Sequence, residues 1–137
     1  FSIWSRISSS PEATRITIVA SGDDEILDQI EKQVAKLIDV RDIKVLAPDD
    51  SVFRELVLIK VKATAKERQA VISVADIFRA KIVDIAPESL IVELTGTQSK
   101  IEAFISLLEG YEILELARTG ITGLGRGIDN VTYLEDE

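Results

Sequence analysis

The stretch KIVDIAPESLIVELT, residues 81–95, contains two short apolar runs separated by Pro-Glu-Ser. Alternation of apolar and polar residues is typical of a strand with one buried face, and a polar triplet that contains proline favours a turn. We therefore predict a β-hairpin here. The elements on either side of the hairpin determine the kind of sheet to which it belongs.

The segment that follows the hairpin is predicted to be a helix. Ser99 and Glu102 have the spacing of a capping box, in which two side chains satisfy backbone N–H groups at a helix N-terminus. Apolar residues then recur at helical spacing until Gly110, where we expect the helix to end.

A second helix, residues 65–80, is predicted before the hairpin. Strands are predicted over residues 53–63, ahead of this helix, and over residues 112–118, behind the other one. The first of these strands is apolar on both faces in its early part, which indicates a central position. Residues 54–118 therefore follow the order β-α-β-β-α-β. This order is typical of a ferredoxin-like sandwich, an α+β fold with two helices on one face of a four-stranded antiparallel sheet.

The N-terminal third of the chain repeats part of this order. A strand over residues 15–20 leads to a glycine, a helix that begins near Asp23, and a second strand over residues 41–47. Gly22 and Gly96 occupy matching places, where a residue without Cβ lets the chain turn tightly from strand into helix. Strand–helix–strand units are common, so a chance similarity stays open. A true repeat would mean two ferredoxin-like sandwiches in tandem, the first lacking its first strand and helix.

The elements divide the chain into four predicted parts. The segment Pro-Asp-Asp-Ser interrupts the alternation and favours a linker or a long turn. Because the chain begins with phenylalanine and contains no methionine, we also expect it to be a fragment of a longer polypeptide. The predicted parts are an incomplete N-terminal domain over residues 1–47, a linker over 48–53, a C-terminal ferredoxin-like domain over 54–127 and an acidic tail over 128–137.

Composition limits the function of this 137-residue chain. Asp and Glu number 24 against 16 Lys and Arg, and the net charge of −8 disfavours nucleic acid and membranes with anionic lipid as partners. No apolar run reaches the roughly 18 residues of a membrane-spanning helix. Cysteine and histidine are absent, which excludes disulfides, thiolate metal sites and the commonest general base at neutral pH. An enzyme that relies on Asp, Glu, Lys, Ser and Tyr stays open.

Four glycines lie in ARTGITGLGRG, residues 117–127, and raise the question of a phosphate-binding loop. Such a loop needs glycines between a strand and a helix whose N-terminal amides point at the anion. Here the glycines follow the last predicted strand, and no helical pattern comes after them. We therefore expect an exit strand in which Ile121 and Leu124 pack on a core or on a partner.

Several stretches of the chain closely resemble the regulatory, or small, subunit of acetohydroxyacid synthase, also called acetolactate synthase. The resemblance covers roughly residues 12–127. Its most specific parts are FRAKIVD at 78–84, TGTQSKIEAF at 95–104 and ARTG at 117–120. These blocks follow one another in the order and at the spacing of the family.

The resemblance implies an N-terminal ACT domain, a βαββαβ module that binds amino acids, followed by a second ferredoxin-like domain. It implies a non-catalytic chain that binds a thiamine-diphosphate-dependent catalytic subunit, raises its activity and confers feedback inhibition by valine or another branched-chain amino acid. Thiamine diphosphate, FAD and Mg would belong to the catalytic subunit, so no cofactor is expected in this chain. The resemblance also implies a homodimer or larger assembly in the cytoplasm, or in an organelle if a transit peptide has been lost.

Site residues are transferred only where the sequence matches. In the family, the effector site is formed by the turn after the first ACT strand and by the start of the first helix, and this sequence lacks both. Ile3 is the one effector-site candidate that the resemblance provides. The candidates for partner contact are Trp4, Arg54, Arg79 and Arg118. For each of these four, an ordinary role at a sheet edge, a helix end or the surface is the alternative.

Two other functions stay open from the sequence. A stand-alone ACT sensor would bind an amino acid without a synthase partner. A small ferredoxin-like enzyme resembling acylphosphatases would need a phosphate-binding loop with a positioned arginine after its first strand. The segment VKATAKERQA, residues 61–70, matches such a loop poorly.

Overall fold

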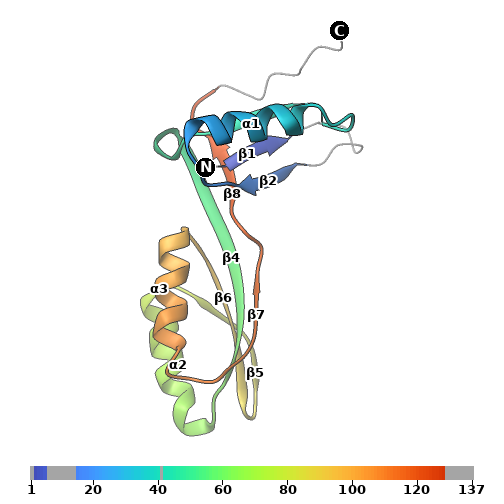
Figure 1. Cartoon of the computed structure of the whole chain (residues 1–137). Helices are drawn as coiled ribbons and strands as arrows, with labels where there is room; N and C mark the ends of the chain where they lie inside the picture. The colour runs from blue at the N-terminus through green and yellow to red at the C-terminus, as the bar shows by residue number, and fades with distance from the viewer. Residues whose placement is uncertain (1, 6–14, 41, 129–137) are drawn as a thin grey trace. The chain divides into compact units, whose positions relative to one another are not determined.

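The computed structural model of the protein describes residues 2–5, 15–40 and 42–128 (Figure 1). The chain forms two compact units. Unit 1 comprises Phe1–Phe53 together with Thr122–Glu137, and unit 2 comprises Arg54–Ile121. The chain therefore passes from unit 1 into unit 2 between residues 53 and 54 and returns between residues 121 and 122.

Unit 2 consists of antiparallel strands and two helices, in the order along the chain that the sequence predicts. The strands lie in the order β5-β6-β4-β7, so β4 is central, as its apolar sequence indicates. β5 and β6 form the predicted hairpin, in which Ala86 pairs with Ser89 across the turn. The elements are β4 at Ser51–Lys62, α2 at Ala65–Ile77, β5 at Lys81–Ala86, β6 at Ser89–Gly96, α3 at Gln98–Leu108 and β7 at Ile113–Arg118.

The core of unit 2 lies between the sheet and its two helices, which Figure 1 shows on the same side of the strands. Alternate residues of β4 and β6 point into this layer, where they meet the apolar faces of α2 and α3. The rings of Phe78 and Phe104 lie 5.2 Å apart between centroids, a separation at which tilted aromatic pairs attract one another. The buried side chains of this core are Val57, Ile59, Val61, Ala63, Val71, Ala75, Leu90, Val92, Leu94, Ile101, Phe104 and Leu108.

Helix α3 begins before the predicted capping box. Its N-cap is Thr97, whose side chain accepts a hydrogen bond from the backbone N–H of Lys100. Ser99 already lies inside the helix, so the capping box predicted from Ser99 and Glu102 is wrong. Thr97 takes this role because β6 ends at Gly96, which leaves Thr97 as the first residue free to cap the helix.

Unit 1 contains a three-stranded antiparallel sheet in the order β2-β1-β3 and, among its described residues, one α-helix. Asp23 caps this helix, α1, by accepting a hydrogen bond of 2.9 Å from the backbone N–H of Ile26. The helix therefore begins where the sequence predicts. The elements are β1 at Ser2–Ser5, β2 at Ile16–Val19, α1 at Asp24–Ala35, β3 at Ile43–Leu46, a 3-10 helix at Pro48–Asp50, and β8 at Thr122–Gly125, which pairs with β4.

The described part of unit 1 buries little apolar surface. No residue of α1 is buried, although its apolar residues lie on one face of the helix. Ile16 and Val19 of β2 are each more than half exposed. Leu46 is the one hydrophobic side chain that is fully buried among the described residues of this unit.

The two units do not coincide with the predicted domain limits. The segment predicted as a linker, residues 48–53, forms the 3-10 helix and the first residues of β4. The glycine-rich segment after β7 returns to unit 1 as β8, where the backbone N–H of Arg126 donates to the carbonyl of Asp50 at 2.8 Å. Leu124 is 58% exposed, so it does not pack on a core, and its packing on a partner stays a prediction. Of the acidic tail predicted over 128–137, residues 129–137 lie outside the described part.

Candidate functional site

Two of the predicted site residues lie on β1, the middle strand of the sheet in unit 1. Ile3 pairs with Ile18 of β2 and with Val45 of β3. Trp4 is the next residue along the strand, so its backbone is not at a sheet edge. The side chains of β1 lie outside the described part of the structure, so the roles predicted for Ile3 and Trp4 stay predictions.

Arg79 lies at the end of α2, with its side chain exposed. Its φ of 57° falls in the left-handed region, which is unusual for a residue other than glycine. The backbone N–H of Ala80 donates to the carbonyl of Ala75 at 2.8 Å, and that of Arg79 donates to the carbonyl of Asp76 at 3.1 Å. These are the two hydrogen bonds of a Schellman motif, which commonly ends a helix with glycine at this position. Arg79 therefore terminates α2 in a strained conformation.

Arg54 and Arg118 are far apart in the sequence, and they lie on the neighbouring strands β4 and β7, which pair in the sheet of unit 2. Arg54 is an exposed residue of β4. Arg118, the last residue of β7, forms a two-pronged ion pair with Glu55, the next residue of β4. Its Nε donates to Oε1 at 2.6 Å, and its second terminal nitrogen donates to Oε2 at 2.9 Å. In the structure, Arg118 therefore pairs with a carboxylate of its own chain. Its predicted contact with a partner subunit stays a prediction.

Glu55 is the buried member of this pair. Its side chain is 3% exposed, whereas that of Arg118 is 32% exposed. The guanidinium of Arg118 donates hydrogen bonds that hold the pKa of Glu55 below its usual range, against the opposite effect of burial. Glu55 in turn raises the pKa of Arg118. Both groups are therefore charged at neutral pH.

The two residues after Arg118 continue this attachment of β7 to β4. The backbone N–H of Thr119 donates to the carbonyl of Leu56 at 3.0 Å, and the hydroxyl of Thr119 accepts from the backbone N–H of Leu56 at 3.1 Å. Gly120 then turns the chain with a φ of 79°, a conformation that favours glycine. Its backbone N–H also contributes to the lowered pKa of Glu55. We call Glu55, Leu56, Arg118, Thr119 and Gly120 the Glu55 cluster.

The Glu55 cluster explains why the segment ARTG has its particular residues. The arginine neutralises a buried carboxylate, the threonine bonds to the backbone of β4, and the glycine permits the turn. The segment does not form a phosphate-binding loop, because no helix follows it among the described residues. A few residues later, Gly123 lies against the ring of Phe53, where a Cβ would come within 2.6 Å of a ring carbon.

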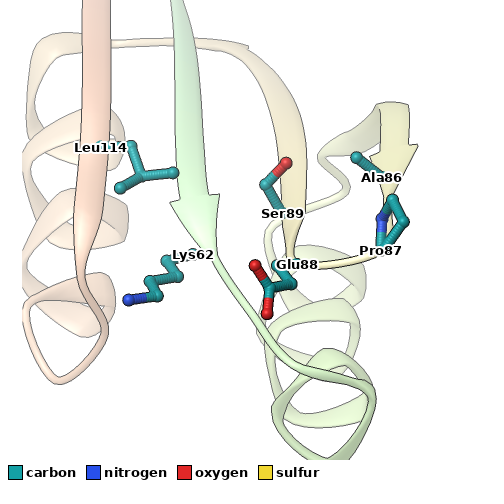
Figure 2. A pocket seen from close by; sticks show the side chains of 6 residues that line it. All are labelled: Lys62, Ala86, Pro87, Glu88, Ser89 and Leu114. Atoms are coloured by element: carbon teal, nitrogen blue, oxygen red, sulfur yellow. The ribbon is translucent and has the colours of Figure 1, made fainter.

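The structure also has a shallow depression of about 440 Å3 on unit 2 (Figure 2). Its charged side chains are exposed, and the ammonium of Lys62 already lies 3.3 Å from the carboxylate of Glu112. Arg68 of α2 donates to the carbonyls of Ala86 and Pro87, which fixes the turn at its rim. The residues that line it are Lys62, Ala86, Pro87, Glu88, Ser89 and Leu114. No buried polar group faces into this depression among them, so it does not constitute a built ligand site.

Within the part of the chain that the structure describes, no three acidic side chains are grouped so that they could hold a metal ion. In the same part, no helix has the length and apolar character needed to cross a membrane. The described geometry therefore centres on the Glu55 cluster, which is held by ordinary hydrogen bonds and one ion pair.

Comparison with known proteins gives a consistent result. The family model for the small subunit of acetolactate synthase matches residues 54–127. A protein of Methanothermobacter thermautotrophicus, named "Probable acetolactate synthase small subunit", is 49% identical over 121 residues, which cover 88% of this chain and 72% of that protein. The acetolactate synthase small subunit of Haemophilus influenzae is 43% identical over 122 residues, 88% of this chain and 75% of that protein.

The chain belongs to the acetolactate synthase small subunit family. A crystal structure of the acetolactate synthase small subunit from Thermotoga maritima superposes with a TM-score of 0.82 at 40% identity, over 93% of this chain and 80% of that one. The resemblance inferred from the sequence is therefore confirmed. As an acetolactate synthase small subunit, the chain is a non-catalytic, regulatory subunit.

The sequence-based interpretation of this small subunit missed the role of Glu55. Glu55 lies in phase with Val57, Ile59 and Val61 in the alternation of β4, so the pattern itself places it on the inward face. A carboxylate at an inward position needs a cation or several hydrogen bonds. That requirement was the available signal for a buried ion pair, although it does not single out Arg118 among the 16 lysines and arginines of the chain.

Proposed function

We propose that this small subunit activates a thiamine-diphosphate-dependent catalytic subunit of acetolactate synthase and makes it sensitive to inhibition by a branched-chain amino acid, with valine as the first candidate. The observation that carries the proposal is the 49% identity to a relative over 72% of that relative's length. Such similarity extends well beyond one motif, and it includes both units of the chain.

We assign the sensing of the amino acid to unit 1, as an ACT domain that is incomplete in this chain, and we propose that the two units are ferredoxin-like sandwiches in tandem. In support, unit 2 has the β-α-β-β-α-β order with strand order β5-β6-β4-β7, and unit 1 repeats a strand–helix–strand part of it. A free amino acid needs backbone amides for its carboxylate and carbonyls for its ammonium, with a small apolar pocket for its side chain. Ile3 is the residue that we propose for such a pocket.

We also propose that the small subunit is a homodimer or a larger assembly in the cytoplasm. β2 is at the edge of its sheet and exposes Ile16, Ile18 and Val19. An exposed apolar edge strand favours pairing with another chain. Light scattering of the purified full chain would give the mass in solution, and Val19→Lys should lower it; a monomer at all concentrations would contradict the assembly. Fractionation of the native cells would test the location.

The test of the regulatory function is reconstitution. The full-length small subunit is mixed with the purified catalytic subunit from the same organism, and acetolactate formation is measured with and without valine, leucine and isoleucine. We expect the small subunit to raise the rate and at least one of the three amino acids to lower it. An unchanged rate in every mixture contradicts the proposal. Amino-acid binding with no effect on the synthase would instead indicate a stand-alone sensor.

A further inference from the structure

The two units are joined by two stretches of chain. One is β4, which begins in unit 1 at Ser51 and continues into unit 2. The other lies between β7 of unit 2 and β8 of unit 1. These two stretches are the covalent links between the units, and they offer a route along which a change in one unit reaches the sheet of the other.

In unit 2, the Glu55 cluster ties the two stretches together at the point where they enter. Glu55 is the second residue of unit 2 on the first stretch, and Arg118 lies three residues before the end of unit 2 on the second. Glu55 is the buried member of the ion pair between them. Beside this pair, Leu56 and Thr119 are joined by hydrogen bonds. The two stretches therefore enter the sheet of unit 2 as one fixed pair.

In unit 1, the same two stretches are tied again. The backbone N–H of Arg126 donates to the carbonyl of Asp50. Gly123 lies so close to the ring of Phe53 that no Cβ would fit between them without displacement. The two stretches are therefore in direct contact with one another within unit 1, as they are within unit 2.

A buried ion pair with two hydrogen bonds has a narrow choice of geometries, and separating its members leaves a buried carboxylate without its cation. A displacement of β4 is therefore costly unless β7 moves with it. An exposed ion pair lacks this property, because water replaces the lost partner at little cost. Lys60 and Glu115 provide the comparison, since they link the same two strands at 3.0 Å with both side chains exposed.

We propose that Glu55 and Arg118 are positioning residues that couple the occupancy of the amino-acid site in unit 1 to the response of unit 2. The inference rests on the proposed function, because it presupposes an amino acid that regulates the synthase. When the amino acid favours one arrangement of unit 1, the tied stretches carry that preference into the sheet of unit 2, and an effector acts only to the extent that the two states differ in free energy.

The experiment uses the full-length small subunit reconstituted with its catalytic subunit, in wild type, Glu55→Gln and Glu115→Gln. Glu55→Gln removes the buried charge and keeps the shape of the side chain, while the partly exposed Arg118 can be hydrated. Glu115→Gln removes the exposed pair on the same strands and is the matched control. Valine binding to each isolated small subunit is measured by calorimetry. Valine inhibition of each reconstituted enzyme is measured relative to its own rate without valine.

For Glu55→Gln we expect valine binding to the isolated small subunit within about two-fold of wild type, and a half-maximal inhibitory concentration raised by about ten-fold or more. Glu115→Gln should match wild type in both measurements. Wild-type inhibition in Glu55→Gln overturns the inference, as does an equal loss in Glu115→Gln. Loss of valine binding in Glu55→Gln also overturns it, because the pair would then support the site itself.

The wild-type mixture separates this inference from the proposed function. If valine, leucine and isoleucine all leave the wild-type enzyme uninhibited, the proposed function fails, and the inference fails with it. If wild type is inhibited and Glu55→Gln behaves identically, only the inference fails. Should Glu55→Gln not fold, as judged by circular dichroism, Arg118→Lys takes its place, since it keeps the charge but gives up the two-pronged geometry. Inhibition of that variant at the wild-type valine concentration overturns the inference.

Discussion

Helices α1 and α3 differ by one residue in length, 12 against 11, and each carries its apolar residues on one side. α3 buries Ile101, Phe104 and Leu108, whereas α1 buries none of its residues. The same contrast holds for the strands, since β4 and β6 are apolar and buried inward while β2 is exposed. An amphipathic pattern thus indicates which face of a helix or strand packs against other residues. It does not indicate whether those residues belong to the same unit.

The largest expected effect comes from truncating the core of unit 2. Phe104→Ala should cost about 3–5 kcal/mol of unfolding free energy, because the neighbouring side chains only partly fill the cavity. Val34→Ala on α1 is a smaller truncation of a partly exposed side chain and should cost about 1 kcal/mol or less at low protein concentration. Denaturant titration of the full chain, read with site-resolved hydrogen exchange in each unit, measures both. Equal losses would break the comparison and show that α1 is covered in solution.

The next effect is the dependence of stability on pH. Unit 2 has a buried carboxylate, Glu55, and unit 1 has another, Asp42, and their pKa values are shifted in opposite directions. Arg118 lowers the pKa of Glu55, so its stabilising contribution is present above the unfolded pKa of about 4.3 and is lost as the pH falls through the folded value. Burial raises the pKa of Asp42, whose Oδ2 has no hydrogen-bond partner within the described structure. Its contribution therefore becomes more favourable as the pH falls through its folded pKa toward about 3.9.

Acid should consequently loosen unit 2 while it favours unit 1 at Asp42. Hydrogen exchange from about pH 6 to 3, corrected for intrinsic rates, should show protection falling first around Leu56 and Thr119. Glu55→Gln should remove that dependence, and Asp42→Asn should remove the gain in unit 1. A common acid transition that neither variant alters would mean that these two carboxylates do not set the difference.

A smaller effect is expected from glycine replacements. Gly123→Ala should destabilise unit 1 by about 1–3 kcal/mol, because the new Cβ would lie 2.6 Å from Phe53 and 3.2 Å from Leu46. Gly110→Ala is the control in unit 2, where no atom lies within 4 Å of the added Cβ. Thermal unfolding should show the control unchanged or slightly more stable. Equal destabilisation by both changes would contradict the close approach of β8 to Phe53.

The smallest effect is a gain. Arg79→Gly should stabilise unit 2 by about 1 kcal/mol or less, because glycine adopts a φ of 57° without the strain that arginine has there, although it loses more chain entropy on folding. The shift of the thermal midpoint measures it. A lower midpoint would indicate that the Arg79 side chain makes a stabilising interaction that outweighs the strain.

Much of unit 2 follows from the sequence, because its core residues come from one contiguous stretch and their periodicity is unambiguous. The hairpin over 81–95, the central place of β4 and the end of α3 before Gly110 were all predictable from local pattern. The N-cap was missed by two residues, because Thr97 and Ser99 are equally good caps and only the end of β6 decides between them.

The Glu55 cluster and the limits of the units were harder to predict, because they depend on residues far apart in the chain. Glu55 and Arg118 are separated by 63 positions, and no local rule pairs them. The return of β8 to unit 1 depends on the backbone hydrogen bond between Arg126 and Asp50 and on the guanidinium of Arg15, which donates to the carbonyl of Gly123 at 2.8 Å. Local side-chain patterns indicate neither contact.

The pairing of β8 with β4 has a consequence for protein engineering. Unit 1 consists of two separate segments of the chain, and unit 2 is inserted between them. The first and last strands of unit 2, β4 and β7, are neighbours in its sheet. A single cut after residue 53 would separate the N-terminal part of unit 1 from β8, the strand at Thr122–Gly125 that belongs to the same unit. Chimeras between two such proteins should therefore exchange residues 54–121 as a block, leaving the flanking strands from one parent.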